Sequence, residues 1–84
     1  MDDSVTLREF ERLARRLGIT IKYTHEGPSG LCTVKGIRVL YIDRTLDSES
    51  RIKIFIREFR SIDLSGYYVV PLIRNLLGTE DEVF

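Results

Sequence analysis

The stretch LCTVKGIRVLYID, residues 31–43, decides the fold of this 84-residue chain. Its first four residues predict a strand, and Lys35-Gly36 fits the two-residue connection of a β-hairpin. Ile37 to Asp43 predicts the strand that follows. Because Val39 to Ile42 is apolar at every position, both faces of this strand need cover. We therefore expect a central strand with helices on one face and a partner chain on the other.

A helix and a further strand are predicted upstream of this hairpin. Residues 19–23 alternate apolar and polar side chains, as a half-buried strand does. Before them, apolar residues recur at helical spacing, and Gly18 ends that helix. Thr6, with Glu9 three residues later, fits a capping box, so we predict Thr6 as the N-cap. The apolar face of this helix comprises Leu7, Phe10, Leu13, Ala14 and Leu17.

Two helices are predicted downstream of the central strand. Asp47 or Ser48 is the expected N-cap of the first, which continues to about Arg60. Residues 52–56 leave two interpretations open, because isoleucines at 52, 54 and 56 also alternate as in a strand. The capping residues and a length of about a dozen residues favour helix. Pro71 begins a third, short helix that Gly78 closes.

The element order predicts an α+β domain with a mostly antiparallel three-stranded sheet and helices on one face. A chain of 84 residues supports one modest core, so we expect a single domain over residues 1–84. Its ordered body is predicted at about residues 4–78, followed by a loose acidic tail over residues 79–84.

Charge and composition narrow the class of protein. Hydrophobic residues make up 43% and charged residues 31% of the chain, which is typical of a globular domain. The net charge is zero, but five of the 13 acidic residues lie at the two ends, so the body has a net charge of +5. A single cysteine cannot form an internal disulfide. The acidic start argues against a signal peptide, and the apolar runs are too short to span a membrane. We therefore expect a cytoplasmic protein without a membrane partner.

Residues suited to catalysis or metal binding are scarce. His25 and Cys32 are the only histidine and cysteine. His25 beside Glu26 is a candidate acid/base pair, but a solvated loop explains both residues better. Cys32 is expected to be a small buried strand residue rather than a nucleophile. The segment 27–30 predicts a turn rather than a phosphate loop, because no helix follows it. The carboxylates Asp43, Asp47, Glu49 and Asp63 fit no calcium-loop spacing. We assign no catalytic, cofactor-binding or metal residue and predict a non-enzymatic protein.

Two kinds of interaction surface remain as hypotheses. The first is a protein interface, most simply in a homodimer, because the chain has more apolar and tyrosine side chains than its small core needs. Its candidates are Tyr41, Ile54, Tyr67, Tyr68 and Val69. Equally, these residues could complete the core of the monomer. The alternative is a nucleic-acid-binding accessory protein that uses arginine-rich helix faces. Its candidates are Arg8, Arg12, Arg15 and Arg16.

The segment LARRLGI, residues 13–19, resembles the LAxxLGI opening of the ImmA/IrrE-like metallopeptidases. The similarity runs from about Leu7 to Ser61 and places residues 51–60 where that family has its zinc helix. It implies a match of Glu58 to the family's H-E-x-x-H glutamate, with Arg57 and Ser61 at the histidine positions. Neither side chain replaces imidazole at zinc, so this resemblance implies a metal-free, non-catalytic relative.

A second resemblance is to small uncharacterised bacterial proteins that share a Gly-Leu-Cys strand and a Leu-x-Gly-x-Tyr segment. The corresponding residues here are Gly30-Leu31-Cys32 and Leu64-Ser65-Gly66-Tyr67-Tyr68. This resemblance implies no function.

Overall fold

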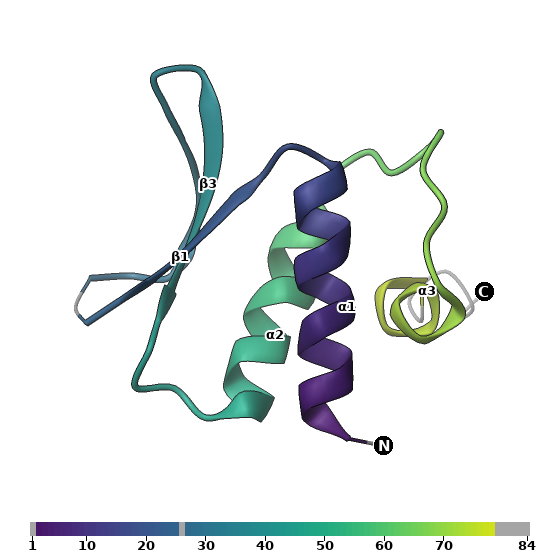
Figure 1. Ribbon diagram of the computed structural model, residues 1–84, viewed down its shortest axis with the longest axis horizontal. Coiled ribbons are helices and arrows are strands. Elements are labelled where there is room, and N and C mark those ends of the chain that lie inside the picture. The colour runs from purple at the N-terminus through teal and green to yellow at the C-terminus, as the bar shows by residue number, and fades with distance from the viewer. Residues whose placement is uncertain (1, 26, 79–84) are drawn as a thin grey trace.

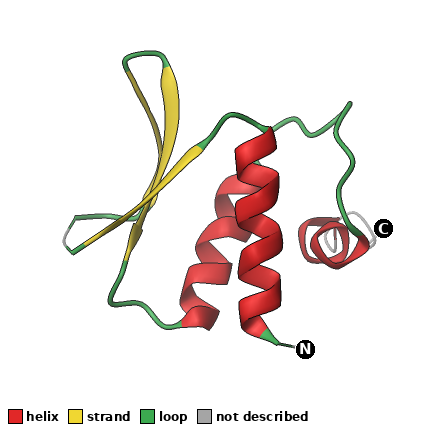
Figure 2. Cartoon of the chain, viewed as in Figure 1, coloured by secondary structure: helices red, strands yellow, loops and turns green. Residues whose placement is uncertain are grey.

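Six elements follow one another in the predicted order in a computed structural model that describes residues 2–25 and 27–78. They are α1 (Asp3–Arg16), β1 (Thr20–Thr24), β2 (Gly30–Val34), β3 (Ile37–Asp43), α2 (Ser48–Phe59) and α3 (Pro71–Gly78). The sheet forms one layer, α1 and α2 pack beside it, and α3 lies on the far side of the two helices (Figure 1). The colouring of Figure 2 shows the same division into a strand layer and a helical part. The predicted α+β class is confirmed, and the predicted acidic tail lies outside the described residues.

The sheet has the order β1-β3-β2, so β3 is the central strand, as predicted. β2 pairs antiparallel to β3, with Leu31 opposite Leu40. β1 pairs parallel to β3, with Ile21 also beside Leu40. The sheet is therefore mixed, whereas the sequence predicted mostly antiparallel pairing. The reason is that the β1–β2 loop reverses the chain without making β1 and β2 neighbours. Loop and β2 together supply the crossover of about a dozen residues that a parallel pair requires.

Local turn chemistry accounts for the hairpin and for the end of α1. Lys35 and Gly36 have φ values of 52° and 83°, so both central residues of the β2–β3 turn are left-handed. Such a turn matches the twist of the strands that it joins. Gly18, with φ 77°, ends α1 in the same conformation, as predicted.

The two long helices begin at aspartates. Asp47 caps α2 and accepts a hydrogen bond from Ser50 N–H at 2.8 Å, which confirms one of the two predicted caps. For α1 the predicted cap is wrong, because Asp2 is the N-cap and accepts from Ser4 N–H at 3.0 Å. Starting one turn earlier puts Thr6 inside the helix, where its side chain is buried. The pKa of each capping carboxyl is lowered, mainly by the backbone hydrogen bond that it accepts.

Three phenylalanines form the centre of the core. Phe10 of α1 stacks on Phe55 of α2 with ring centroids 5.0 Å apart. Phe59 meets both rings edge-on, at 5.5 and 5.8 Å. From the sheet, Leu40 and Ile42 of β3 belong to the same core and are fully buried. The interior thus lies between the inner face of the sheet and the three helices, and it includes residues from every helix.

Residues 52–56 are helical, which resolves the ambiguity between helix and strand. Their alternating isoleucines arise because α2 packs against neighbours on two sides. Arg51 lies 5.2 Å above the Tyr23 ring of β1, and Glu58 accepts from Leu31 N–H of β2 at 3.3 Å. Ile54 is three residues from Arg51 and four from Glu58, so it shares their sheet-facing side.

Within residues 2–25 and 27–78, no helix combines the length and apolar content that a membrane span requires.

Candidate interaction surfaces

The described helices leave the outer face of the sheet open. Leu40 and Ile42 point inward, so the alternate residues of β3 and their register partners point outward. All the described helices lie on the opposite side of the sheet (Figure 1). The outward residues are Thr20, Lys22, Thr24, Gly30, Cys32, Val34, Ile37, Val39, Tyr41 and Asp43.

An apolar strip runs along the middle of this outer face. Ile37 is 54% exposed and Val34, its register partner, 40%. Val39 is buried, and it lies between Thr20 and Cys32 of the neighbouring strands. Tyr41, a predicted interaction residue, continues the strip and is half-buried. The outer face therefore presents branched aliphatic and aromatic side chains directly to solvent.

Cys32 is exposed, which contradicts the predicted buried strand residue. Its register partner is Val39, so its side chain points to the outer face, while the neighbouring Leu31 points inward. A hollow of about 420 Å³ adjoins Cys32 and Tyr41 at this end of the sheet, with Pro28 and Gly30 among its other walls. The sequence could have predicted the outward direction of Cys32. A two-residue hairpin at Lys35-Gly36 pairs Cys32 with Val39, and Val39 points outward if Leu40 points inward.

The positions that the metallopeptidase resemblance assigns to zinc chemistry hold α2 against β2. Arg57 Nε donates to Glu58 Oε2 at 2.7 Å, and Arg57 Nη2 donates to the Ser29 carbonyl at 3.0 Å. Glu58 Oε1 accepts from Leu31 N–H, a backbone donor on the edge of the sheet. Ser61 Oγ donates to the Glu58 carbonyl at 2.7 Å. Arg57 and Glu58 therefore connect the last turn of α2 to the start of the edge strand, and Ser61 bonds to the end of its own helix.

Other candidate chemical groups are distributed over the surface. Among residues 2–25 and 27–78, no three His, Cys, Asp or Glu side chains are grouped so that they could hold a metal ion. Asp43 accepts hydrogen bonds from the backbone N–H and hydroxyl of Thr45, and Asp63 from the hydroxyl and backbone N–H of Ser65. These bonds lower the pKa of both carboxyls. Together with the helix cap Asp47, these carboxylates have local structural roles. His25 is exposed in the loop after β1.

Three of the predicted polyanion-binding arginines share one hollow. Arg12, Arg15 and Arg16 line a depression of about 430 Å³ on α1, together with Tyr68 and Val70. Arg16 Nη2 donates to the Tyr68 carbonyl at 2.8 Å, and Arg12 pairs with Glu9 at 3.3 Å. Arg8, the fourth predicted residue, is exposed but is not among the lining residues. An aromatic side chain thus adjoins a basic helix face.

The predicted interaction residues do not form one surface. Ile54 is 8% exposed and Val69 6%, so both belong to the core and are not available for docking. Tyr67 and Tyr68 are exposed, but their segment lies across the helix pair from the outer face of the sheet (Figure 1). Only Tyr41 remains on that outer face. The strip residues Val34 and Ile37 were absent from the predicted set.

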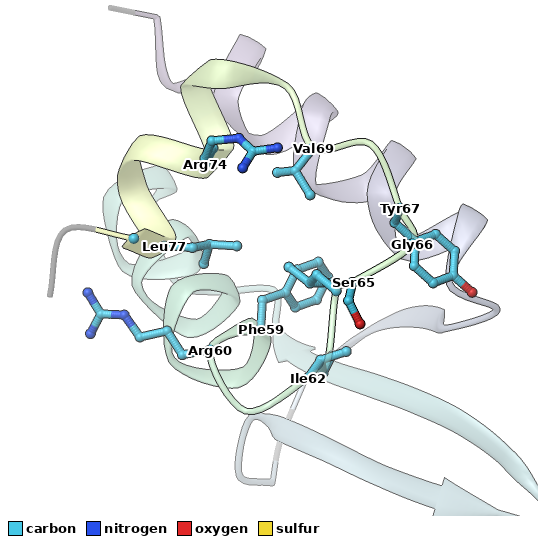
Figure 3. Close-up of a pocket in the computed structure, with 11 residues that line it drawn as sticks. Phe59, Arg60, Ile62, Ser65, Gly66, Tyr67, Val69, Arg74 and Leu77 are labelled. Carbon is cyan, nitrogen blue, oxygen red and sulfur yellow. The ribbon is translucent and has the colours of Figure 1, made fainter. Parts of the chain in front are cut away.

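A third hollow lies between the end of α2, the segment 60–70 and α3, with a volume of about 550 Å³. Figure 3 shows Arg74 and Leu77 reaching into it from α3, opposite Phe59 and Ile62. Tyr67 stands at its rim, so this predicted interaction residue borders a cavity.

Comparison of the chain with models of known protein families gave no match, and neither did comparison with curated proteins or with solved structures. A function for this chain therefore has to be argued from its own geometry and chemistry.

Proposed function

We propose that this chain is a non-enzymatic protein-interaction domain that binds a second copy of itself through the outer face of its sheet. The observation that carries the proposal is the apolar strip of Val34, Ile37, Val39 and Tyr41 on a face that the described helices leave open. A parallel strand pair such as β1–β3 is usually covered on both faces. A second sheet packed face to face would supply that cover.

Charge favours a second copy as the occupant. Among the outward residues, Lys22 and Asp43 are the charged ones, so the face has no net charge to repel an identical face. An isologous dimer repeats every contact twice. Lys22 of each copy can therefore approach Asp43 of the other at the rim, while the apolar strips meet in the middle.

The size of the face predicts a weak dimer. Three strands of this length cover roughly 20 Å by 14 Å per copy. Two such faces amount to roughly 560 Å², well below the roughly 1,200 Å² at which the range for specific complexes begins, so the adjoining loops have to contribute. We therefore expect association that depends on protein concentration in the micromolar range or above.

Light scattering over a tenfold concentration range, at low and high salt, tests the proposal. The wild-type mass should rise towards that of a dimer at both salts, because the strip is apolar. Ile37→Lys should leave a monomer throughout, since it places a charge in the middle of the strip.

Val5→Lys is the matched control, because Val5 is exposed to a similar extent, 40%, but lies on α1. It should associate like the wild type. A monomeric wild type would refute self-association. Loss of the dimer in Tyr68→Ala, with Ile37→Lys unaffected, would move the interface to the other side of the helices.

A second candidate function is the binding of single-stranded nucleic acid at the α1 hollow. The observation in its favour is the proximity of Arg12 and Arg15 to Tyr68, which combines basic groups with an aromatic ring. It predicts oligonucleotide affinity that falls steeply with added salt. The Arg12→Gln/Arg15→Gln double variant should abolish this binding, whereas Arg44→Gln/Lys53→Gln, altered elsewhere, should retain most of it.

A further inference from the structure

The hollow beneath α3 is lined by apolar and polar groups in about equal measure. Phe59 and Ile62 form one wall and Leu77 the opposite wall, while Val69 lies next to Arg74 (Figure 3). Its volume of about 550 Å³ lies within the range that small-molecule sites occupy. Apolar walls of this kind favour the burial of a hydrocarbon, so we expect the apolar part of a ligand to lie against them.

Arg74 indicates the charge of the polar part of such a ligand. Its backbone lies in the first turn of α3, and its side chain extends along the cavity towards Val69 (Figure 3). A guanidinium group offers several N–H donors in one plane and binds a carboxylate with two hydrogen bonds. Ser65 and Tyr67 are also among the lining residues, and the Ser65 hydroxyl donates to Asp63. Arg60 also lines the hollow, but Figure 3 shows its side chain directed away from Val69, whereas Arg74 reaches towards Val69. A cation beside apolar side chains is complementary to an anion with a hydrocarbon tail.

We propose that this cavity binds a medium-chain carboxylic acid, with the carboxylate on Arg74 and the hydrocarbon chain against Phe59, Ile62 and Leu77. The site is separate from the outer face of the sheet and does not depend on self-association. An alcohol of the same chain length would keep the apolar contacts but lose the ion pair with Arg74. A short carboxylate would keep the ion pair but lose most of the apolar contacts.

Titration of the full chain with decanoate, followed by NMR of the backbone amides and methyl groups, tests the proposal. The largest shifts should map to Ile62, Val69 and Leu77. Affinity should rise about fourfold for each methylene added between hexanoate and decanoate, if each one becomes buried. Decanol should bind about tenfold more weakly than decanoate, because it lacks the charge-assisted hydrogen bonds.

Arg74→Gln should weaken decanoate about tenfold and leave decanol unchanged, whereas Arg8→Gln, a matched change on α1, should affect neither. The amide spectrum of each variant verifies that the fold is retained. Equal affinity of wild type and Arg74→Gln for decanoate would overturn the proposal. Shifts centred on Val34 and Ile37 would also overturn it, because they would show adsorption of the hydrocarbon to the outer face of the sheet.

Discussion

The two faces of β3 are equally apolar in sequence but have different surroundings. Leu40 and Ile42 point inward and are fully buried against the helices and the phenylalanine cluster. Ile37 and Tyr41 point outward, and Ile37 keeps more than half of its surface in water. On the outer face of β3, Val39 is the one buried apolar side chain, so most of the stabilising burial by this strand lies on the face that the helices cover. On the other face, the same kind of side chain is available to a partner.

The largest expected effect is a difference in the free energy of unfolding between substitutions on the two faces of β3. Leu40→Ala should lower the free energy of unfolding by about 2–5 kcal/mol, because it leaves a cavity in the core. Ile37→Ala should lower it by less than about 0.5 kcal/mol, since the isoleucine is exposed and the monomer loses little burial. Urea denaturation at a low protein concentration gives both values.

If Leu40→Ala does not fold, Leu40→Val provides the inner-face measurement with a smaller loss. Equal losses at positions 37 and 40 would show that the outer face is packed as tightly as the inner face, contrary to the comparison.

A smaller effect is expected on the inner side of β1, where Tyr23 OH donates to Glu11 Oε2 at 2.5 Å. Tyr23→Phe removes this hydrogen bond but keeps the ring beneath Arg51, so it should cost about 1 kcal/mol near neutral pH. Burial, followed by the hydrogen bond to Glu11, raises the pKa of Tyr23 to about 12.

The raised pKa gives this prediction a pH dependence with a defined sign. The unfolded chain ionises Tyr23 near its ordinary pKa of 10, but the folded chain holds the proton to about 12. The contribution of Tyr23 to stability is therefore complete below pH 10 and is lost as the pH rises from 10 to 12. Denaturation of wild type and Tyr23→Phe at pH 8, 10 and 11 should show a shrinking difference. A constant difference would indicate that the phenol group is not held in its neutral form.

The smallest expected effect is on the reaction rate of the Cys32 thiol on the outer face, and it involves no change in the free energy of unfolding. Cys32 should react with a disulfide reagent in the native protein at a rate within about tenfold of the unfolded chain, because it is exposed. The reaction should slow as protein concentration rises, if a second copy covers the strip. Ile37→Lys should react at the same rate at every concentration. Full protection of Cys32 in the dilute monomer would contradict the exposed outer face.

The candidate surfaces were only partly predictable. Tyr41 is half-buried on the outer face of the sheet and Tyr68 is exposed, since the amphipathic side chain of tyrosine can keep its polar tip at the surface. Of the two alternatives left open for Ile54, the structure shows the core, because α2 packs against both the sheet and α1 and needs a wide apolar face. The grouping of Arg12 and Arg15 with Tyr68 joins residues more than fifty positions apart, so local patterns could not reveal it.

Sequence by itself determined the elements of this protein and most of their ends. Gly18 and the pair Lys35-Gly36 act through their own backbone conformations, and Asp47 through a donor three residues away, so each signal is complete within a few residues. Only the tertiary structure decided that β1 runs parallel to β3, that Ile54 is buried, and that the segment between α2 and α3 lies across the helix pair from the sheet. These outcomes depend on contacts between distant segments, and their free energy comes from burial that no local pattern records.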